Sequence, residues 1–389
     1  YNTIAIDDGS ETLGGYNGSG FEIHDLDPTN EAWEENGSNH VGSVIADELN
    51  DGDYDYIDYD YSNAWDDSVA TYAEREFIYL RSQGGTNDEY VVVYDRIEAA
   101  NSSWQKYFLV QCPSEPTLYD GDDSSVTMST GEYPGGDTNG IWTEAITNAY
   151  SVKLDNTYSA NSSHGRLFYR PILPASLDIH KVNGPGYYWE DIRGTQVAVA
   201  DGDGSLSDEE KNYHGEYATW FQPATGNTYD KLLTVFQIGS TSTAESSTIL
   251  TAMVDTAAIT GTTGSTGALT GVHIKDATEN RIVLFNDQKR ATQATQAAPY
   301  VYTATVTANS HHLLTNITIN QTFSVSDGSQ VVATPTSTAN GVLEFQDTDN
   351  DSGSITYTIT ETGVEAVSTT KVTVGGKKLK EGLKTVILE

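Results

Sequence analysis

Several residue types that mark common protein classes are scarce in this sequence. A single cysteine, Cys112, among 389 residues excludes a framework of internal disulfides. Because Cys112 follows a strand-like run, we interpret it as a small core residue rather than a nucleophile. No run of about 18 apolar residues occurs, so no membrane-spanning segment is predicted. Helical periodicity is also nearly absent, and only 66–75 and 207–213 suit a turn or two of helix.

Positive charge is scarce as well. The chain has 20 Lys and Arg against 56 Asp and Glu, a formal net charge of -36. Such a surface repels nucleic acid, anionic membranes and polyanionic glycans, unless divalent cations or a local basic cleft intervene. It suits salty or calcium-rich water, where screening weakens self-repulsion. The chain opens on Tyr1 rather than Met, which we interpret as a processed form. We therefore expect an extracellular or cell-surface protein.

What the sequence does contain is a succession of short β-like runs between turn clusters. Thr, Val and Tyr suit a pleated, half-buried surface, while Gly and Asn supply turns. Such runs are found at 89–95, 107–110, 152–154, 167–169, 232–238, 271–274, 281–285, 302–306, 323–325 and 355–359. Many short strands without long helices predict an all-β protein built of antiparallel sandwiches.

The length favours more than one packed unit. Residues 259–267, rich in Gly and Thr, resemble a linker, but strands follow, so we interpret them as a long loop inside the first unit. The polar stretch 289–298 is the better boundary. We predict a large β-sandwich domain at 1–290, a small β-domain at 291–362 and a basic terminal strand or hairpin at 363–389.

Three stretches carry a recognisable order of motifs. The chain opens with Tyr1-Asn2-Thr3, the pair Asp95-Arg96 precedes a strand at 104–109, and Gly165-Arg166-Leu167-Phe168 leads to Leu173-Pro174. In this order and spacing, over about 1–290, they resemble the β-sandwich region of heparinase II/III-like polysaccharide lyases. The resemblance implies a large sandwich followed by a smaller one, without the helical toroid that precedes the sandwich in that family.

The resemblance also implies a chemistry, but two positions of this chain lack the residues that the family uses for it. Such lyases cleave uronic-acid polysaccharides by β-elimination, with residues from the toroid and a His from the sandwich, and some hold zinc in the sandwich. Tyr1 stands where the family has His before Asn-Thr, and Gln111 stands at or near the end of its Leu-Leu-His strand. Glutamine is a poor zinc ligand and no base at neutral pH. The resemblance therefore favours the fold but predicts no catalytic residue in this chain.

The sharpest local motif is Asp201-Gly202-Asp203-Gly204-Ser205, with Glu210 beyond it. Oxygen ligands at alternate positions and a Gly for the tight turn are typical of calcium loops. The match is partial, because the first loop position falls on Val199. We expect either a calcium site with ligands Asp201, Asp203, Ser205 and Glu210, or an acidic solvated turn.

Two further patterns concern tyrosine and histidine. The segment 50–61 alternates acidic and aromatic residues and predicts a strand with Tyr54 and Tyr56 on the face opposite Asp53 and Asp55. We favour tyrosines packed inward over a sugar- or cation-binding surface. His311 and His312 are neighbours, so on a strand they point to opposite faces and do not easily share an ion.

Six sequons permit surface glycosylation without showing it. They are Asn17, Asn36, Asn101, Asn161, Asn316 and Asn320.

Three functions of different classes remain open. The first is a secreted, non-catalytic structural protein that associates with copies of itself in a filament, sheath or surface layer. Strand edges, or the basic segment with its five lysines, would guide that association. The second is a carbohydrate-binding module that uses Trp65, Trp104, Trp189 or Trp220, and the third is a processed fragment of a lyase. We rank them in that order.

Overall fold

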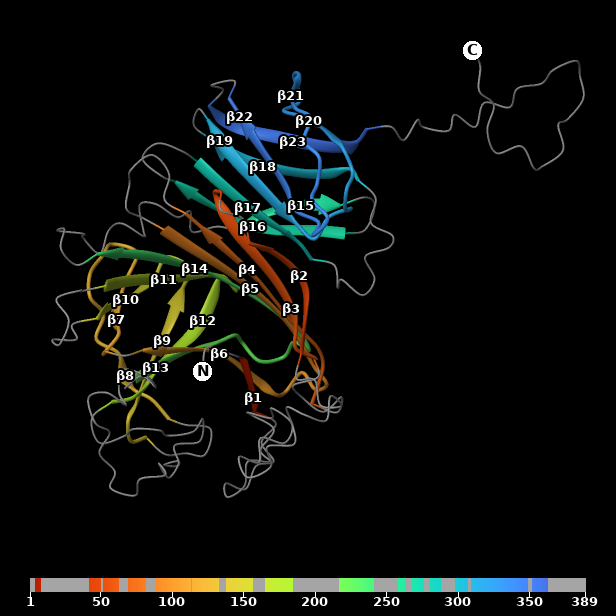
Figure 1. Cartoon of the computed structure of the whole chain (residues 1–389). Helices are drawn as coiled ribbons and strands as arrows, with labels where there is room; N and C mark the ends of the chain where they lie inside the picture. Colours follow the sequence, from red (N-terminus) through yellow and green to blue (C-terminus); the bar gives the residue numbers. More distant parts are fainter. Residues whose placement is uncertain are drawn as a thin grey trace, which may run out of the picture.

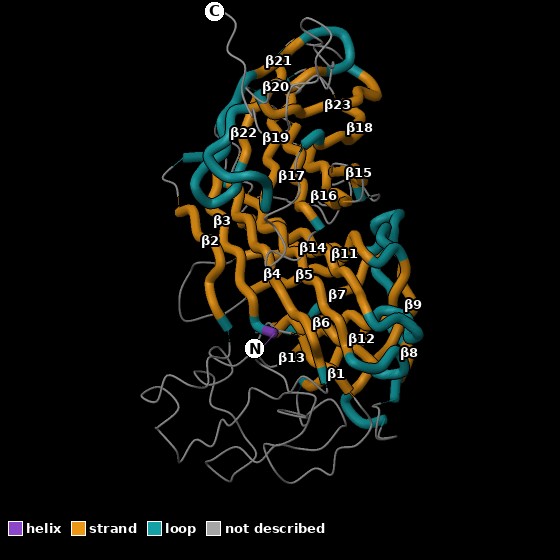
Figure 2. The backbone as a smooth tube through the Cα atoms, turned by 90° about the vertical axis from the view of Figure 1, so that its right-hand side faces the viewer, coloured by secondary structure: helices purple, strands orange, loops and turns teal. Residues whose placement is uncertain are grey.

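The described part of the chain confirms the predicted all-β class. The computed structural model describes residues 4–7, 42–49, 52–62, 69–81, 89–112, 114–132, 138–156, 165–184, 217–240, 258–263, 267–275, 280–287, 298–306, 309–348 and 352–362. These residues form strands joined by turns, with no α-helix among them (Figure 2). Consequently, nothing in this part of the chain is a helix long and apolar enough to cross a bilayer.

The strands form three sheets that follow one another from the bottom to the top of Figure 1. The outer sheet has the order β1 (Ile4–Asp7), β6 (Gln105–Cys112), β13 (Tyr217–Gln222), β12 (Ser176–Asn183), β9 (Ile141–Thr147), β8 (Ser129–Thr130). The middle sheet has the order β2 (Ser43–Leu49), β3 (Tyr54–Asp60), β4 (Ala70–Leu80), β5 (Glu89–Ala99), β14 (Tyr229–Ser240), β11 (Gly165–Leu173), β10 (Ser151–Asn156), β7 (Thr117–Tyr119).

The third sheet, which we call the curled sheet, has nine strands. Their order is β21 (Val331–Ala333), β20 (Phe323–Ser326), β23 (Gly353–Glu361), β18 (Tyr300–Val306), β15 (Ile259–Thr263), β16 (Gly267–Lys275), β17 (Asn280–Asn286), β19 (Ser310–Thr315), β22 (Leu343–Asp347). Its inward residues form a hydrophobic core of their own, in which Tyr302, Phe345 and Tyr357 meet. Because one sheet supplies that whole core, it must curl around it.

The middle sheet is buried on both faces. On one face Ile97 and Tyr169 share a core with Phe108 and Phe221 of the outer sheet. On the other face a second core joins residues of β3, β4 and β5 to Val272, Phe285 and Leu313 of the curled sheet. A strand buried on both faces needs apolar residues at nearly every position, which explains the unbroken run of β-formers in β5.

The predicted tyrosine pattern of 50–61 is confirmed. Tyr54 and Tyr56 are buried in the core toward the curled sheet. Tyr59 and Tyr61 lie at odd positions, so they reach the core toward the outer sheet, where their rings stack 5.9 Å apart. The alternation therefore continues through the strand, and the tyrosines change face because both faces are cores.

A buried arginine joins the middle sheet to the curled sheet. Arg96 is 0 % exposed and pairs with the carboxylates of Glu74 and, at 2.7 Å, Glu76. Its Nη1 also donates to the Asn286 carbonyl of β17, 2.9 Å away. Burial alone acts to lower the pKa of Arg96, but Glu76 and Glu74 outweigh it and raise this pKa well above its ordinary value. The guanidinium therefore stays charged between the layers.

The partners of Arg96 are themselves held from both sheets. Glu76 accepts hydrogen bonds from Tyr56 (2.8 Å) of the middle sheet and Thr315 (2.6 Å) of the curled sheet. Beside them, Asp287 accepts from Tyr94 (2.6 Å) and Thr270 (2.9 Å). A buried charge is tolerated only with such partners, so this network fixes how the two sheets dock.

The opposite face of β5 carries a second charged pair. Asp95, the residue before Arg96, points toward the outer sheet and is bound by both Nε (2.8 Å) and Nη2 (3.0 Å) of Arg75. The Tyr61 hydroxyl donates to the same carboxylate at 3.0 Å. The Asp-Arg motif thus serves both faces of the middle sheet, because adjacent strand residues point to opposite sides.

The predicted domain boundary at 290 does not coincide with a break between sheets. β15, β16 and β17 precede residue 290, yet β15 pairs with β18 and β17 pairs with β19. Residues 259–263, interpreted above as part of a loop, form β15 instead. The helical turns predicted for 66–75 are also wrong where the structure describes that segment, because β4 begins at Ala70. Long-range pairing decides these points, and local patterns do not report it.

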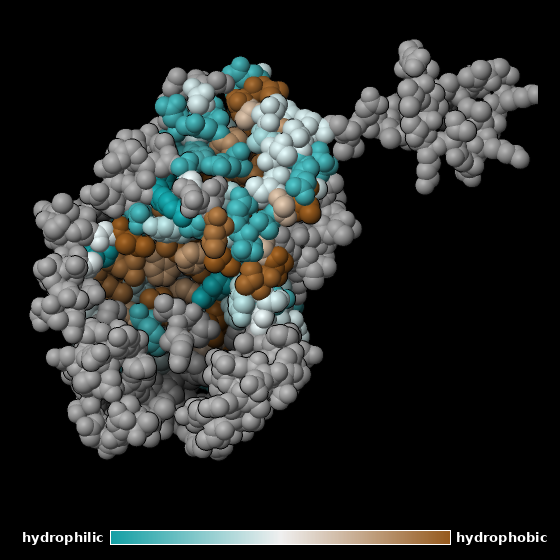
Figure 3. Space-filling model, in the orientation of Figure 1, coloured by the Kyte–Doolittle hydropathy of each residue, from teal (hydrophilic) through white to brown (hydrophobic). Residues whose placement is uncertain are grey.

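The described sheet edges are short or protected. β1, β8, β7, β21 and β22 are brief, and the longest edge strand, β2, has a bulge between Val44 and Ala46. Asn340 covers part of that edge, since its Nδ2 donates to the Asp47 carbonyl at 2.6 Å. Bulges and covers of this kind limit strand addition by another chain. An apolar area is nevertheless visible over the middle of the molecule (Figure 3), and Val44 and Leu49 of β2 are exposed.

Replacing Arg96 tests whether this network holds the layers together. We expect Arg96→Met to lower the free energy of unfolding by about 3–5 kcal/mol, because it leaves Glu74 and Glu76 buried without their cation. Urea unfolding followed by circular dichroism measures the change. Arg166→Met is the matched control, since its partner Asp155 is partly exposed and such a pair contributes about 1 kcal/mol or less. Equal losses in the two variants would contradict the assignment.

Candidate functional site

Several residues singled out from the sequence lie outside the described part of the chain. They are Tyr1, the predicted calcium ligands Asp201, Asp203, Ser205 and Glu210, the sequons Asn17, Asn36 and Asn161, and Trp65 and Trp189. The calcium loop and the role of Tyr1 therefore stay predictions. The other residues can be placed.

Gln111 lies on β6, on the outward face of the outer sheet, opposite Ala218 of β13. Among the described residues, the same face carries the imidazole of His180, beside the rings of Tyr107 and Trp220. His180 is 7 % exposed, and its ring nitrogens bond Thr143 (2.9 Å) and Gln222 (2.7 Å). Burial lowers the pKa of His180 and so favours its neutral form. Both ring nitrogens are already hydrogen-bonded to neighbouring side chains. Trp220, at 3 % exposed, offers no open platform for a sugar ring.

A second imidazole, His312, lies in the core of the curled sheet. It is 0 % exposed and bonds Tyr302 (2.6 Å) and Ser310 (2.7 Å), while Tyr357 donates to Asp347 at 2.9 Å. These residue types resemble a catalytic set, but the acid reaches His312 only through Tyr357 and Ser310. Since every member is buried, the cluster holds β18, β19, β22 and β23 together and has no access for a substrate.

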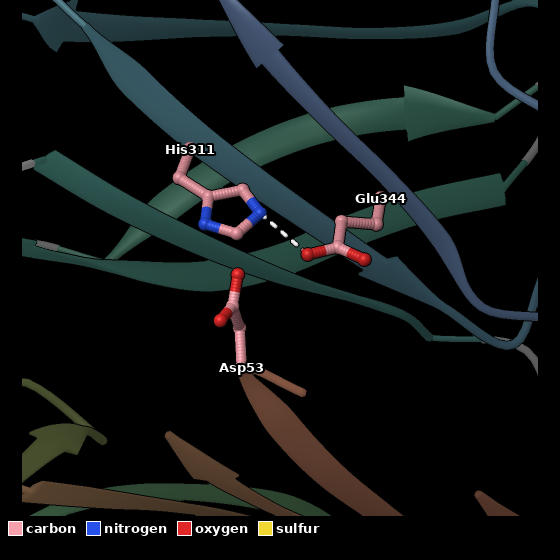
Figure 4. A group of neighbouring side chains, drawn as sticks. All are labelled: Asp53, His311 and Glu344. Carbon is pink, nitrogen blue, oxygen red and sulfur yellow. Dashed lines mark hydrogen bonds and ion pairs between the residues drawn. The ribbon is translucent and has the colours of Figure 1, made fainter. Parts of the chain in front are cut away.

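His311 points the other way, toward the middle sheet, as the alternation predicted. Its Nε2 lies 2.7 Å from the Glu344 carboxylate on β22, and Asp53 approaches from the bend before β3 (Figure 4). One ligand atom from each of these three residues lies within 4.8 Å of the others. Asp53 is exposed, and the other two are half-buried. Within the described part of the chain, these three residues form a group that could bind a metal ion.

A shallow cleft adjoins the cluster between the middle and curled sheets. Asp53, Tyr54, Leu80, Arg281, Val283 and His311 are among its lining residues. Sequence reasoning missed the cluster because Asp53 is separated from His311 and Glu344 by most of the chain. Only the docking of the two sheets brings them together, and no local motif announces it.

Three other predictions concern single residues. Cys112 is fully buried, and burial raises the pKa of its thiol to about 12, which confirms its interpretation as an inert core residue. Asn101 and Asn320 lie exposed in turns, where a glycan has room. Asn316 does not, because it is 0 % exposed and its amide donates to the Asn286 carbonyl. The expectation of a surface sequon at Asn316 is therefore wrong for the folded chain.

Comparison of the chain with protein-family models and with curated proteins finds no match. The likeness to heparinase II/III-like lyases therefore rests on the motifs quoted above. Among the described ones, Asp95, Arg96 and Lys106 are buried. Asp95 and Arg96 pair with residues of the neighbouring strand β4, and Lys106 of the outer sheet pairs with Asp230 of the middle sheet. They support the packing of the sheets and supply no reactive group at a surface.

The burial of His312 predicts a pH dependence of stability. Burial holds the pKa of His312 well below its ordinary 6.5, and the nearby His311 and His273 lower it further. The unfolded chain then takes up a proton near pH 6.5 that the folded chain refuses. The free energy of unfolding should therefore fall as the pH drops below about 6.5, toward the folded pKa, by at most about 1.4 kcal/mol per pH unit for this proton.

The variant His312→Gln should remove this one-proton contribution while leaving that of His180. Urea unfolding between pH 7.5 and pH 5 gives the slope of stability against pH for both proteins. We expect a shallower slope in the variant. Identical slopes would show that His312 is not the group responsible.

Proposed function

We propose that this chain is a non-catalytic, extracellular structural protein that associates with further copies of itself. One observation carries the proposal: among the described residues, Glu74, His180 and His312 lie buried between or within the sheets together with the groups that bind them. A catalytic acid or base must reach its substrate, whereas Glu74, His180 and His312 have their hydrogen bonds within the protein. Glu74 helps to hold two sheets together, whereas His180 and His312 hold strands of a single sheet together.

The charge of the chain supports an extracellular, salt-bathed setting and speaks against lyase activity. A uronate polysaccharide has the same sign of charge as this protein, so its approach is opposed. Gln111 adds no base to the outward face of the outer sheet. A carbohydrate-binding role finds no support at Trp220 or at Trp104, which packs partly buried against the core.

Association between copies is proposed to be electrostatic rather than by strand addition. The described edges are brief, bulged or partly covered, as shown above. Five lysines instead lie within residues 363–389, on a chain whose net charge is -36. A basic segment attracts the acidic body of a neighbouring copy, and this attraction is screened by salt.

The prediction concerns the salt dependence of the oligomeric state. Sedimentation and light scattering of the purified chain should show larger species at low ionic strength and monomers at high ionic strength. Changing Lys371, Lys377, Lys378, Lys380 and Lys384 to Gln should leave monomers at both. Changing Ser368, Thr369, Thr370, Thr373 and Thr385 to Gln instead keeps the lysines and is the matched control. Monomers of the unmodified chain at every salt and protein concentration would overturn the proposed association.

The non-catalytic part of the proposal has a separate test. The chain is incubated with uronate polymers, and the ultraviolet absorbance of the unsaturated product is followed. A turnover that survives repurification, and is lost on changing His180 to Gln, would replace the structural proposal with a lyase.

A further inference from the structure

His311 and Glu344, at the rim between the middle and curled sheets, lie on one face of paired strands. β19 and β22 pair so that His311 lies opposite Gln346 and Leu313 lies opposite Glu344. His311 and Glu344 are therefore diagonal neighbours on the same face, the arrangement in which side chains of adjacent strands reach each other. β19 is also paired on its other side with β17, so the backbone at His311 is held from both sides.

The third position comes from the other sheet. Asp53 precedes β3, and its backbone carbonyl accepts from the Arg81 amide at 2.9 Å, which fixes the bend. Its carboxylate points at the His311 ring (Figure 4). Within the described residues that carboxylate makes no hydrogen bond. Two carboxylates that face one imidazole repel each other, and a bound cation removes that repulsion.

We propose that Asp53, His311 and Glu344 bind one divalent transition-metal ion of the zinc class, which ties the middle sheet to the curled sheet. An imidazole nitrogen with two carboxylate oxygens is a common set for zinc and its neighbours, whereas calcium prefers ligands that are all oxygen. Three protein ligands leave a fourth position to water, and the exposure of Asp53 gives that water access. The site is separate from the loop 201–210 predicted above to bind calcium.

The present distances suit this with small adjustments. Tetrahedral ligands, each about 2.1 Å from zinc, lie roughly 3.4 Å from one another. The hydrogen bond of 2.7 Å between His311 and Glu344 must open slightly, and Asp53, within 4.8 Å, must move inward. Both changes are side-chain rotations on fixed backbone. Arg281 lines the same cleft and donates to the Arg81 carbonyl at 2.7 Å. Its positive charge lowers the affinity expected of the site.

The experiment uses the full chain after treatment with a chelator. Zn²⁺ is added in a calorimetric titration, Co²⁺ is added to follow its visible absorption, and Ca²⁺ and Mg²⁺ serve as comparison ions. We expect one equivalent of Zn²⁺ or Co²⁺, a Co²⁺ spectrum of low coordination number, and a higher melting temperature with Zn²⁺. Because the chain has eight His, the result that decides is the difference between variants.

His311→Gln, Asp53→Asn and Glu344→Gln should each weaken that one equivalent by about tenfold to a hundredfold and abolish the rise in melting temperature. Gln at 311 keeps a donor toward Glu344, so these rim variants are expected to fold. Asp122→Asn, at an exposed turn, is the matched control and should bind like the unmodified chain. Unchanged Zn²⁺ binding in all three variants, or an equal response to Ca²⁺, would overturn the site.

Discussion

The pairing of Arg96 with Glu74 and Glu76 is the constraint on which the arrangement of the sheets depends. A guanidinium that is 0 % exposed has lost its hydration, and only partners at fixed positions compensate for that loss. The partners of Arg96 come from two sheets, because the Asn286 carbonyl belongs to the curled sheet. Thr315 of the curled sheet also donates to Glu76, so that the carboxylate is held from both sheets. Apolar contact would tolerate sliding of one sheet over the other, whereas this network permits a single docking.

The middle position of one sheet explains several features that look unrelated in the sequence. Both faces of its central strands pack on cores, so these strands have little polar surface to give to solvent. Tyrosines in and directly after β3 divide between the faces, with Tyr56 on one and Tyr61 on the other. Asp95 and Arg96 divide in the same way and satisfy a separate partner on each side. The charged residues of the Asp95-Arg96 motif therefore lie between layers, together with their partners, the partly buried Arg75 and the buried Glu76.

Local patterns predicted the local structure well and the long-range structure poorly. Side-chain alternation and β-propensity predict the strand positions and the inward tyrosines. They also predict the buried Cys112 and the opposed directions of His311 and His312. The boundary at 290 falls inside the curled sheet, because β15 and β17 pair with strands beyond it. Asn316 was misjudged because a sequon carries no information about burial. The Asp53, His311 and Glu344 cluster needed the docking of two sheets, which no window of sequence contains.

The residues that carry a resemblance need not be the residues that carry a function. Asp95, Arg96 and Lys106 lie within the motifs that suggest a lyase-like sandwich, and each is buried and paired with an oppositely charged residue of another strand. Such residues determine how the layers dock, whatever side chains the surface carries. Chemistry is free to change at the rim, where side chains such as Asp53 and His311 meet solvent without holding a core. The packing of the layers and the chemistry at their rim are therefore separate properties of the same chain.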